Sequence, residues 1–221
     1  MTRAGPRLVL FDCDGTLVDS QHLIVATMDD AFRTCGLPPP TRARTLSIVG
    51  LSLAEAMIEL VPSAKPYDIQ RLVAAYRDGA TRVRASGIED TLYEGAAETV
   101  ARLAGRNDTV LGVATGKSHR GVLRLFDHHG WHDHFATIQT ADNNPSKPHP
   151  GMIVSAMSET GAAPGTTVMI GDTTYDMIMA RAAGCRAIGV TWGYHAEADL
   201  VRAGAHEIVR DYAGLERVLG A

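Results

Sequence analysis

The sequence predicts an α/β fold in which a core with a parallel sheet is interrupted once by an all-helical segment. Four short apolar runs have the length of buried strands, and from residue 96 onward they alternate with segments of helical periodicity. Between the first run and the helical pattern that starts at residue 96, about seventy residues, 20–90, carry helical periodicity alone. We therefore expect residues 1–19 and 88–221 to form the core and residues 20–87 to form an inserted helical domain.

The predicted strands are continuous apolar runs, which is typical of strands buried in a parallel sheet. They are Leu8–Phe11, Val110–Ala114, Thr167–Ile170 and Ala187–Val190. Because helices alternate with these strands, we expect right-handed crossovers between parallel neighbours.

The predicted helices repeat apolar side chains on one face at intervals of three and four. In the core they cover residues 97–104, 122–126, 153–160 and 177–183. In the inserted segment they cover residues 23–32, 54–61 and 69–76, the last of which continues towards Arg84. Gly36 and the run Pro38–Pro40 end the first of these inserted helices.

Composition excludes several classes of partner and location. The chain has 221 residues, a formal net charge of −4 and no basic stripe, so nucleic acid is not expected as a partner. No apolar stretch approaches the length of a membrane span, and the N-terminus lacks the features of a signal peptide. Cys13, Cys35 and Cys185 have neither disulfide nor zinc spacing. These observations predict a cytoplasmic protein without a membrane partner.

Two acids follow the first predicted strand directly. Asp12 and Asp14 stand two residues apart, before a turn at Gly15-Thr16. Two carboxylates this close repel each other unless a cation or a proton lies between them. In α/β sheets, ligands bind beyond the carboxyl ends of the strands. The alternative interpretation is a strand followed by an ordinary polar turn, so the pair predicts a reaction centre without proving one.

The segment after the second predicted strand has the groups that a phosphate needs. Thr115 offers a hydroxyl, and Gly116 offers a backbone N–H where the next helix begins. The alternative is an ordinary helix start capped by Ser118, with Thr115 in a turn.

Two further segments carry candidate charges. Lys147 precedes Pro148 and is followed by Pro150, which predicts an extended, rigid backbone that places its ammonium group accurately. A surface lysine in a loop is the alternative. Asp172 ends the third predicted strand and Asp176 lies in the first turn of the next helix, where capping and the helix dipole are the alternative explanations.

In order along the chain, these four segments resemble the four motifs of the haloacid dehalogenase (HAD) superfamily. LVLFDCDGTLVDS contains the DxDGT pattern, VATGKS resembles the second motif, SKPHP matches K-P-x-P, and GDTTYD matches GDxxxD. The inserted helices stand where one branch of that superfamily has a helical cap. This branch includes phosphoglycolate phosphatase and β-phosphoglucomutase, and the resemblance implies a Rossmann-like parallel-sheet core.

The resemblance also implies a reaction. It is the Mg²⁺-dependent hydrolysis of a phosphate monoester through an aspartyl-phosphate, as in a phosphoric monoester hydrolase. Asp12 would be the nucleophile, and Asp14 would be the general acid and base. Thr115, Gly116 and Lys147 would bind the phosphoryl group.

The metal site is likewise implied by the resemblance. Mg²⁺ would be held by the carboxylates of Asp12 and Asp172 and by the main-chain carbonyl of Asp14. Asp176 would position Lys147 or a metal-bound water.

Two other functions remain possible from the sequence. A sugar phosphomutase of the β-phosphoglucomutase kind would share these motifs, although many such enzymes carry Val where this chain has Thr16. A non-catalytic, phospho-accepting signalling domain also presents acids, a Thr and a Lys at strand ends. Such domains are single units of about 120 residues without a helical insertion, which argues against that class.

We expect a small phosphorylated metabolite as substrate, with 2-phosphoglycolate the leading single candidate. The segment Ser47–Ser52 is the predicted substrate loop. Arg82, Arg84 and Lys65 are the local cations that could meet a second carboxylate. The sequence does not determine the oligomeric state.

Overall fold

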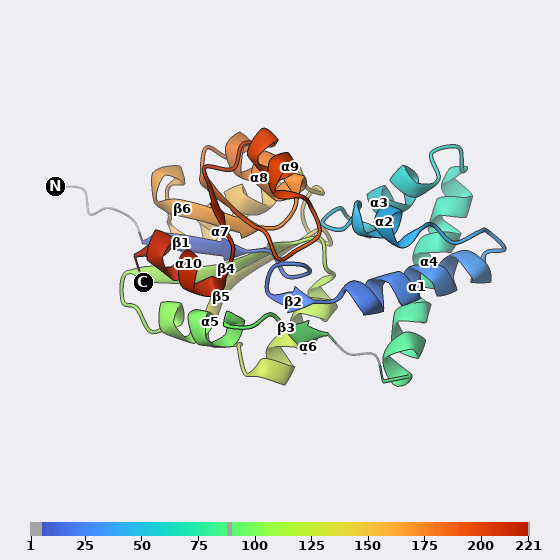
Figure 1. Cartoon of the computed structure of the whole chain (residues 1–221), viewed down its shortest axis with the longest axis horizontal. Helices are drawn as coiled ribbons and strands as arrows, with labels where there is room; N and C mark the ends of the chain where they lie inside the picture. Colours follow the sequence, from blue (N-terminus) through green and yellow to red (C-terminus); the bar gives the residue numbers. More distant parts are fainter. Residues whose placement is uncertain (1–5, 88–89, 221) are drawn as a thin grey trace.

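The computed structural model describes residues 6–87 and 90–220. Its centre is a parallel sheet of six strands in the order β5-β4-β1-β6-β7-β8 (Figure 1). The strands are β1 (Arg7–Phe11), β4 (Thr109–Thr115), β5 (Phe135–Thr140), β6 (Thr167–Gly171), β7 (Arg186–Val190) and β8 (Glu207–Val209). The predicted α/β parallel-sheet fold is confirmed.

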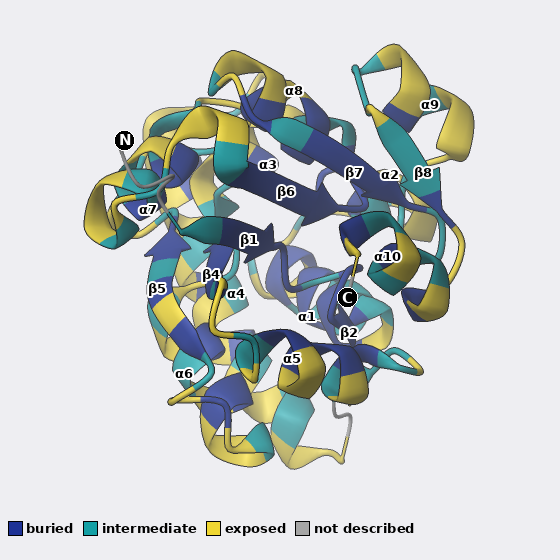
Figure 2. Ribbon diagram, turned by 90° about the vertical axis from the view of Figure 1, so that its left-hand side faces the viewer, coloured by how far each residue is buried: buried dark blue, intermediate teal, exposed yellow. Residues whose placement is uncertain are grey.

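Strand β1 lies in the middle of the sheet and shows why the sheet needs two covering layers. Its successive side chains point to opposite faces, and those of Leu8 to Phe11 are all fully buried. Figure 2 shows β1 and β6 as the buried centre, with exposed residues on the surrounding helices. A strand that is apolar on both faces is stable only when helices pack on both.

One group of helices covers each face of the sheet. Val9 and Phe11 belong to the apolar cluster that contains side chains of α5 (Ala96–Ala104), α6 (His119–His129) and α10 (Tyr212–Leu219). Leu8 and Leu10 belong to the opposite cluster, which contains side chains of α7 (Gly151–Thr160), α8 (Thr174–Ala182) and α9 (Glu197–Arg202). A short 3₁₀ turn, Pro164–Thr166, precedes β6.

Four helices lie between two short strands in the sequence and pack on one another. They are α1 (Gln21–Thr34), α2 (Arg42–Leu46), α3 (Leu53–Leu60) and α4 (Pro66–Ala85), here called the helical unit. The unit has its own apolar cluster, which includes Met28, Phe32, Met57 and Leu72. It stands beside the sheet at one end of the molecule (Figure 1). An independent cluster of this kind is what a separate structural layer requires.

Two short strands connect the helical unit to the core. Strand β2 (Val18–Asp19) precedes α1, and β3 (Thr91–Leu92) follows α4. They pair antiparallel, with Val18 opposite Leu92. Both chain crossings between the core and the helical unit therefore lie side by side. Residues 88 and 89 lie outside the described part.

The predicted strands and helices are present, and the structure adds elements that periodicity did not show. Strand β5 was missed because its buried positions include polar side chains, Thr137, Gln139 and Thr140. These are paired with neighbours, since Gln139 donates to Thr137 and the Thr137 hydroxyl donates to Glu159. Helix α2, helices α9 and α10 and the edge strand β8 were also not predicted; α2, α9 and β8 are short. In the described part of the chain, no helix has the length and apolarity needed to cross a membrane.

Candidate active site

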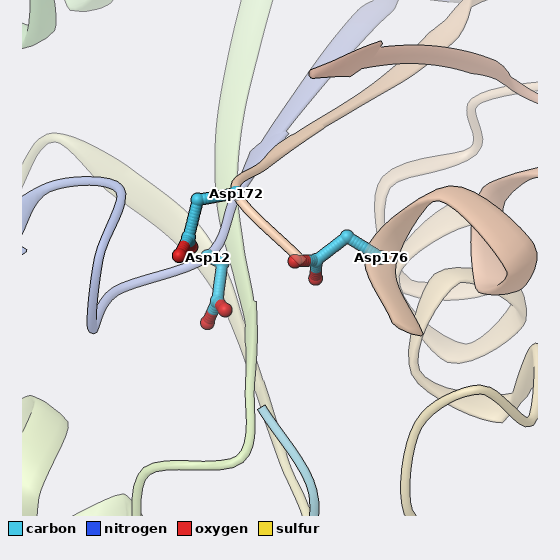
Figure 3. A group of neighbouring side chains, drawn as sticks. All are labelled: Asp12, Asp172 and Asp176. Atoms are coloured by element: carbon cyan, nitrogen blue, oxygen red, sulfur yellow. The ribbon is translucent and has the colours of Figure 1, made fainter. Parts of the chain in front are cut away.

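The order of the strands brings three predicted site residues to one edge of the sheet. Asp12 follows β1, Thr115 ends β4 and Asp172 follows β6, while β4 and β6 are the two neighbours of β1. Ligands bind at this end of a parallel sheet. Figure 3 shows Asp12 and Asp172 with their carboxyl groups side by side and Asp176 turned towards them from α8. One oxygen of each of these three residues lies within 4.8 Å of the other two.

Asp12 is buried and only partly satisfied by hydrogen bonds. The Cys13 N–H donates to its Oδ1 at 2.7 Å. Its Oδ2 lies 2.9 Å from the Nζ of Lys147, yet it receives no well-aligned hydrogen bond from any described residue. Burial, with the negative charge of Asp176 adding to it, raises the pKa of Asp12 to about 6 although Lys147 and Thr115 act in the opposite direction.

Asp172 is enclosed by two glycines and held by neutral donors. The Thr16 hydroxyl donates to Oδ1 at 2.9 Å, and the Tyr194 N–H donates to Oδ2 at 2.8 Å. A Cβ on Gly15, whose φ is +85°, or on Gly193 would lie 2.2 Å from an atom of Asp172. Burial, followed by the charges of Asp12 and Asp176, raises the pKa of Asp172 well above its usual value.

Lys147 is the cation that Asp12 and Asp176 share. Its side chain is fully buried, and its Nζ lies 2.6 Å from Oδ1 of Asp176 and 2.9 Å from Oδ2 of Asp12. Burial alone would lower the pKa of Lys147, but the two carboxylates outweigh burial and raise it. The lysine is therefore charged and internal, which excludes the interpretation as a surface residue.

The backbone around Lys147 differs from the expectation. Pro148 and Pro150 do not produce an extended segment, because the chain turns here and α7 begins at Gly151. The His149 N–H donates to the carbonyl of Ser146 across this turn, and the Lys147–Pro148 peptide bond is cis. The prediction of an extended backbone was wrong, whereas the side chain does reach the site.

Asp176 is committed to Lys147 and to the start of its own helix. Its Oδ2 accepts hydrogen bonds from the N–H and the hydroxyl of Thr173, at 3.1 and 2.7 Å. The N–H of Asp176 donates in return to the Thr173 hydroxyl, which completes a capping box at the N-terminus of α8. Gly171 leaves the space, since a Cβ there would lie 2.3 Å from the carboxyl carbon of Asp176. Asp176 thus caps its own helix, as the alternative explanation held, and it also lies beside the site through its contact with Lys147.

Asp14 lies apart from the buried triad and is held by a lysine that the sequence analysis did not single out. Its Oδ1 accepts from the Ser20 hydroxyl at 2.7 Å and from Nζ of Lys117 at 2.6 Å. Lys117 also lies 3.5 Å from Asp90, which in turn lies 3.7 Å from Arg84 at the end of α4. Burial would lower the pKa of Lys117, but the charges of Asp14 and Asp90 raise it. Lys117 directly follows Thr115-Gly116 in the sequence, and this position is the signal from which it could have been identified as a site residue.

The loop between β4 and α6 contains the helix cap that one interpretation predicted, and it also places Thr115 beside Asp12, as the other interpretation requires. Ser118 is the N-cap of α6 and accepts from the Gly121 N–H, while buried Thr115 ends β4 beside Asp12. Gly116 lies against the helical unit, because a Cβ there would be 2.6 Å from the carbonyl oxygen of Leu51.

The predicted substrate loop, Ser47–Ser52, contacts the core over these strand ends. The Ser52 N–H donates to the Ser146 hydroxyl at 2.7 Å, and the Tyr175 hydroxyl donates to the carbonyl of Ser47 at 3.3 Å. Beneath the helical unit lies a cavity of about 570 Å³, lined by Asp12, Asp14, Thr115 and most of this loop. The cavity therefore opens onto the strand ends from the side of the helical unit.

The cations around this cavity differ in part from those expected. Arg84 lines it, but Arg82 and Lys65 do not: Arg82 forms an ion pair with Asp30 at 2.6 Å, and Lys65 is an exposed residue at the start of α4. The structure adds basic residues that the sequence analysis missed. They are Arg77, Lys117, Arg120 and Arg124.

Comparisons with known proteins agree with this geometry. A family model described as "Haloacid dehalogenase-like hydrolase" matches residues 9–190. The chain is 37% identical over 209 residues to the "Probable phosphatase IndB" of Dickeya dadantii (strain 3937), covering 92% of this chain and 89% of that one. It is 30% identical over 194 residues to the phosphoglycolate phosphatase of Xanthomonas campestris pv. campestris (strain 8004), covering 86% and 85%.

A solved structure shares the fold closely. The crystal structure of a putative haloacid dehalogenase-like hydrolase from Bacteroides fragilis superposes with a TM-score of 0.87 and 24% identity. The match covers 95% of this chain and 99% of that one. The arrangement of sheet and helical unit described above thus occurs in a solved structure.

Proposed function

The chain belongs to the haloacid dehalogenase-like hydrolases, and on that premise we propose that it is a Mg²⁺-dependent phosphatase acting on a small organic phosphate monoester through a phosphorylated Asp12. One observation carries the proposal. Asp12 is a buried carboxylate whose Oδ2 has no well-aligned donor among the described residues, beside Thr115, Lys147 and Asp172 at a cavity that the helical unit covers. Two relatives with "phosphatase" in their names support the reaction class.

The donor set fits a hard divalent cation. Three buried carboxylates, those of Asp12, Asp172 and Asp176, lie close together. The ammonium group of Lys147 pairs with Asp12 and Asp176, whereas the partners of Asp172 are uncharged. Oxygen donors of this kind suit Mg²⁺. We assign the carboxylates of Asp12 and Asp172, with the main-chain carbonyl of Asp14, as the ligands, because Asp176 is already bound to Lys147 and Thr173. When bound, Mg²⁺ would supply positive charge that offsets the repulsion between these carboxylates and the incoming phosphate.

The residues of the chain then have distinct roles in the first step. The Oδ2 of Asp12 forms a bond to phosphorus while the bond from phosphorus to the leaving oxygen breaks. Asp14 gives its proton to that oxygen, so the leaving group departs as an alcohol. The Thr115 hydroxyl, the Gly116 N–H and the ammonium group of Lys147 bind the transferring phosphoryl oxygens.

The second step reverses the role of Asp14. Asp14 takes a proton from water as that water attacks phosphorus, which releases inorganic phosphate and restores the Asp12 carboxylate. Ser20 and Lys117 both meet Oδ1 of Asp14, so we assign Oδ2 as the oxygen that transfers the proton. These two donors hold the side chain in one orientation for both steps.

We propose that residues 20–87 form a cap that moves on the β2–β3 pair. In the closed arrangement, the contacts of Ser52 with Ser146 and of Tyr175 with Ser47 place the loop Ser47–Ser52 over the site. Closure would exclude water during the first step, and opening would release product.

The proposed substrate is a small phosphorylated metabolite in the cytoplasm, with 2-phosphoglycolate as the leading candidate because a relative carries that activity in its name. A sugar phosphomutase remains the second candidate, since it would use the same residues. The two differ in one requirement, because the phosphomutase needs a sugar bisphosphate as primer.

The test is a substrate panel with purified protein and Mg²⁺. We expect phosphate release from phosphoglycolate with a kcat/KM that no hexose phosphate, nucleoside monophosphate or pyrophosphate exceeds by roughly tenfold, about 1.4 kcal/mol of transition-state preference. Asp12→Asn should lose essentially all activity and Asp133→Asn, an exposed acid, should retain it; removal of Mg²⁺ by a chelator should stop turnover reversibly. Conversion of a hexose phosphate isomer without phosphate release would favour the phosphomutase, and near-normal hydrolysis by Asp12→Asn would refute the mechanism.

A further inference from the structure

Two helices, one from the helical unit and one from the core, line the cavity, and both present arginines to it. Helix α4 of the helical unit contributes Arg77 and Arg84, and helix α6 of the core contributes Arg120 and Arg124. Spacings of seven residues on α4 and four on α6 place each pair on one face of its helix. The same cavity reaches Asp12 and Thr115. One continuous space therefore joins the phosphoryl site to a group of guanidinium groups.

Among these arginines, the guanidinium groups of Arg84 and Arg120 are close enough to that of Arg124 to repel it. Burial lowers the pKa of Arg124, and the charges of Arg84 and Arg120 lower it further, while Asp90 opposes them. Asp90 already lies 3.7 Å from Arg84 and 3.5 Å from Lys117. The cavity also has an acid on the core side, Asp142, which accepts from the His119 N–H. Bringing α4 towards α6 thus brings like charges together, and an anion placed between them would reverse that repulsion.

The chemistry of these side chains indicates what the anion is. Guanidinium groups bind carboxylate and phosphate through paired hydrogen bonds. The rest of the wall between the two sites is largely apolar, including Leu23, Met28 and Val73. A cavity of about 570 Å³ also lies within the range of roughly 300–1,000 Å³ that holds medium-sized organic ligands. A carbon skeleton with an anion at each end fits this arrangement of charges.

We propose that Arg84, Arg120 and Arg124 bind a second anionic group of the substrate, a carboxylate or a phosphate, at the end opposite the phosphoryl group on Asp12. The inference rests on the proposed phosphatase function and narrows its substrate class to organic phosphates with a second negative charge. It also gives that charge a second effect, because an anion held by α4 and α6 together stabilises the closed position of the helical unit.

The test compares substrates that differ only in the terminal group. Three pairs offer increasing length: phosphoglycolate with 2-hydroxyethyl phosphate, 3-phosphoglycerate with glycerol 3-phosphate, and 6-phosphogluconate with sorbitol 6-phosphate. In each pair a carboxylate replaces a neutral CH₂OH group. We expect the anionic member to have a kcat/KM roughly tenfold or more above its neutral partner in at least one of the three pairs.

Variants assign the preference to particular residues. Arg84→Gln and the double variant Arg120→Gln/Arg124→Gln should reduce the ratio of anionic to neutral substrate to about threefold or less, mainly through KM. The matched control is Arg217→Gln, which removes the same charge from an exposed position on α10 and should keep the wild-type ratio. Circular dichroism and thermal melting of each variant establish that it is folded.

Each outcome separates this inference from the proposed function. Suppose that p-nitrophenyl phosphate is hydrolysed but the ratio of anionic to neutral kcat/KM is near one in every pair, or is unchanged in all arginine variants. The proposed anion site is then wrong, and the proposed phosphatase function stands. If nothing is hydrolysed, the phosphatase proposal fails, and calorimetry with Asp12→Asn decides the anion site. Tighter binding of 6-phosphogluconate than of sorbitol 6-phosphate that disappears with Arg120→Gln/Arg124→Gln supports the site, and equal binding overturns it.

Discussion

At Asp12, Asp172 and Asp176 the chain buries three carboxylates close together, and the ammonium group of Lys147 pairs with Asp12 and Asp176 but not with Asp172. Burial of unpaired charge costs stability, and here Asp12 and Asp172 respond with raised pKa values. The protein thus keeps at this point an arrangement that is unfavourable without a cation. Electrostatic repulsion of this kind among buried carboxylates is expected where a metal ion and an anionic substrate must be bound together.

This charge arrangement predicts how the stability of the metal-free protein depends on pH. The folded state binds protons at Asp12 and Asp172 more tightly than the unfolded state does, so the free energy of unfolding should rise as pH falls through the folded pKa of Asp12, about 6, towards the ordinary value of 3.8. The loss of stability caused by ionised Asp12 is complete above its folded pKa of about 6 and disappears below the ordinary value of 3.8. Melting temperatures measured in chelator should show this trend.

Asp12→Asn is the control for that measurement. It removes one of the buried charges, so at about pH 8 the metal-free variant should melt several degrees above the wild type, and its curve should be flatter. Mg²⁺ should raise the melting temperature of the wild type more than that of the variant. A variant that melts below the wild type at every pH would contradict the assignment of Asp12 as an unfavourable buried charge.

The identity of most of these residues could be predicted from the sequence, because strand ends in a parallel sheet converge wherever the strands are neighbours. Asp12, Thr115 and Asp172 follow that rule directly. Lys117 could not be found in this way, since its ion pair with Asp14 depends on how the loop after Thr115 folds back over the end of β1. Periodicity carries no information on a contact made by loops.

At the scale of elements, contacts between loops position the site. The loop Ser47–Ser52 lies on Gly116, and Gly116 has room only for a hydrogen atom towards the carbonyl oxygens of Gly50 and Leu51. Strand β5 makes a related point about prediction. Its buried polar side chains are satisfied by hydrogen bonds, from Gln139 to Thr137 and from Thr137 to Glu159, so this strand of the sheet had no continuous apolar signal.

Gly116→Ala should interfere with closure while leaving the fold intact. Alanine keeps the N–H assigned to the phosphoryl group, but its Cβ would lie 2.6 Å from the carbonyl oxygen of Leu51. Relief requires the loop to move away, at a cost of about 1–3 kcal/mol, so we expect kcat/KM to fall roughly tenfold with little change in the free energy of unfolding.

Gly105→Ala is the matched control, because the nearest atom to a Cβ there is an ordinary 3.5 Å away. Steady-state kinetics and urea unfolding of both variants provide the comparison. Equal activity of the two variants would show that the contact between Gly116 and the loop has no part in turnover.

At the scale of the whole molecule, the proposed reaction site lies at the strand ends of the sheet, and the proposed site for the second anion lies in the cavity beneath the helical unit. The α/β order of the elements was readable from the sequence because the core repeats strand and helix. The arginines at the cavity were not, with the exception of Arg84, because their proximity depends on how α4 is placed against α6. A division of this kind lets one reaction centre serve different substrates through changes in the inserted helices.

The central claim is that phosphorus is bonded to Asp12 during turnover, and trapping that bond tests it most directly. Asp14→Asn should accept the phosphoryl group from p-nitrophenyl phosphate, whose leaving group needs no acid, but should hydrolyse the product slowly. Rapid mixing with Mg²⁺ should give a burst of p-nitrophenol, and reduction of the quenched protein with borohydride should convert residue 12 to homoserine, as read by peptide mass spectrometry. A burst without homoserine at residue 12, or homoserine at another aspartate instead, would contradict the account.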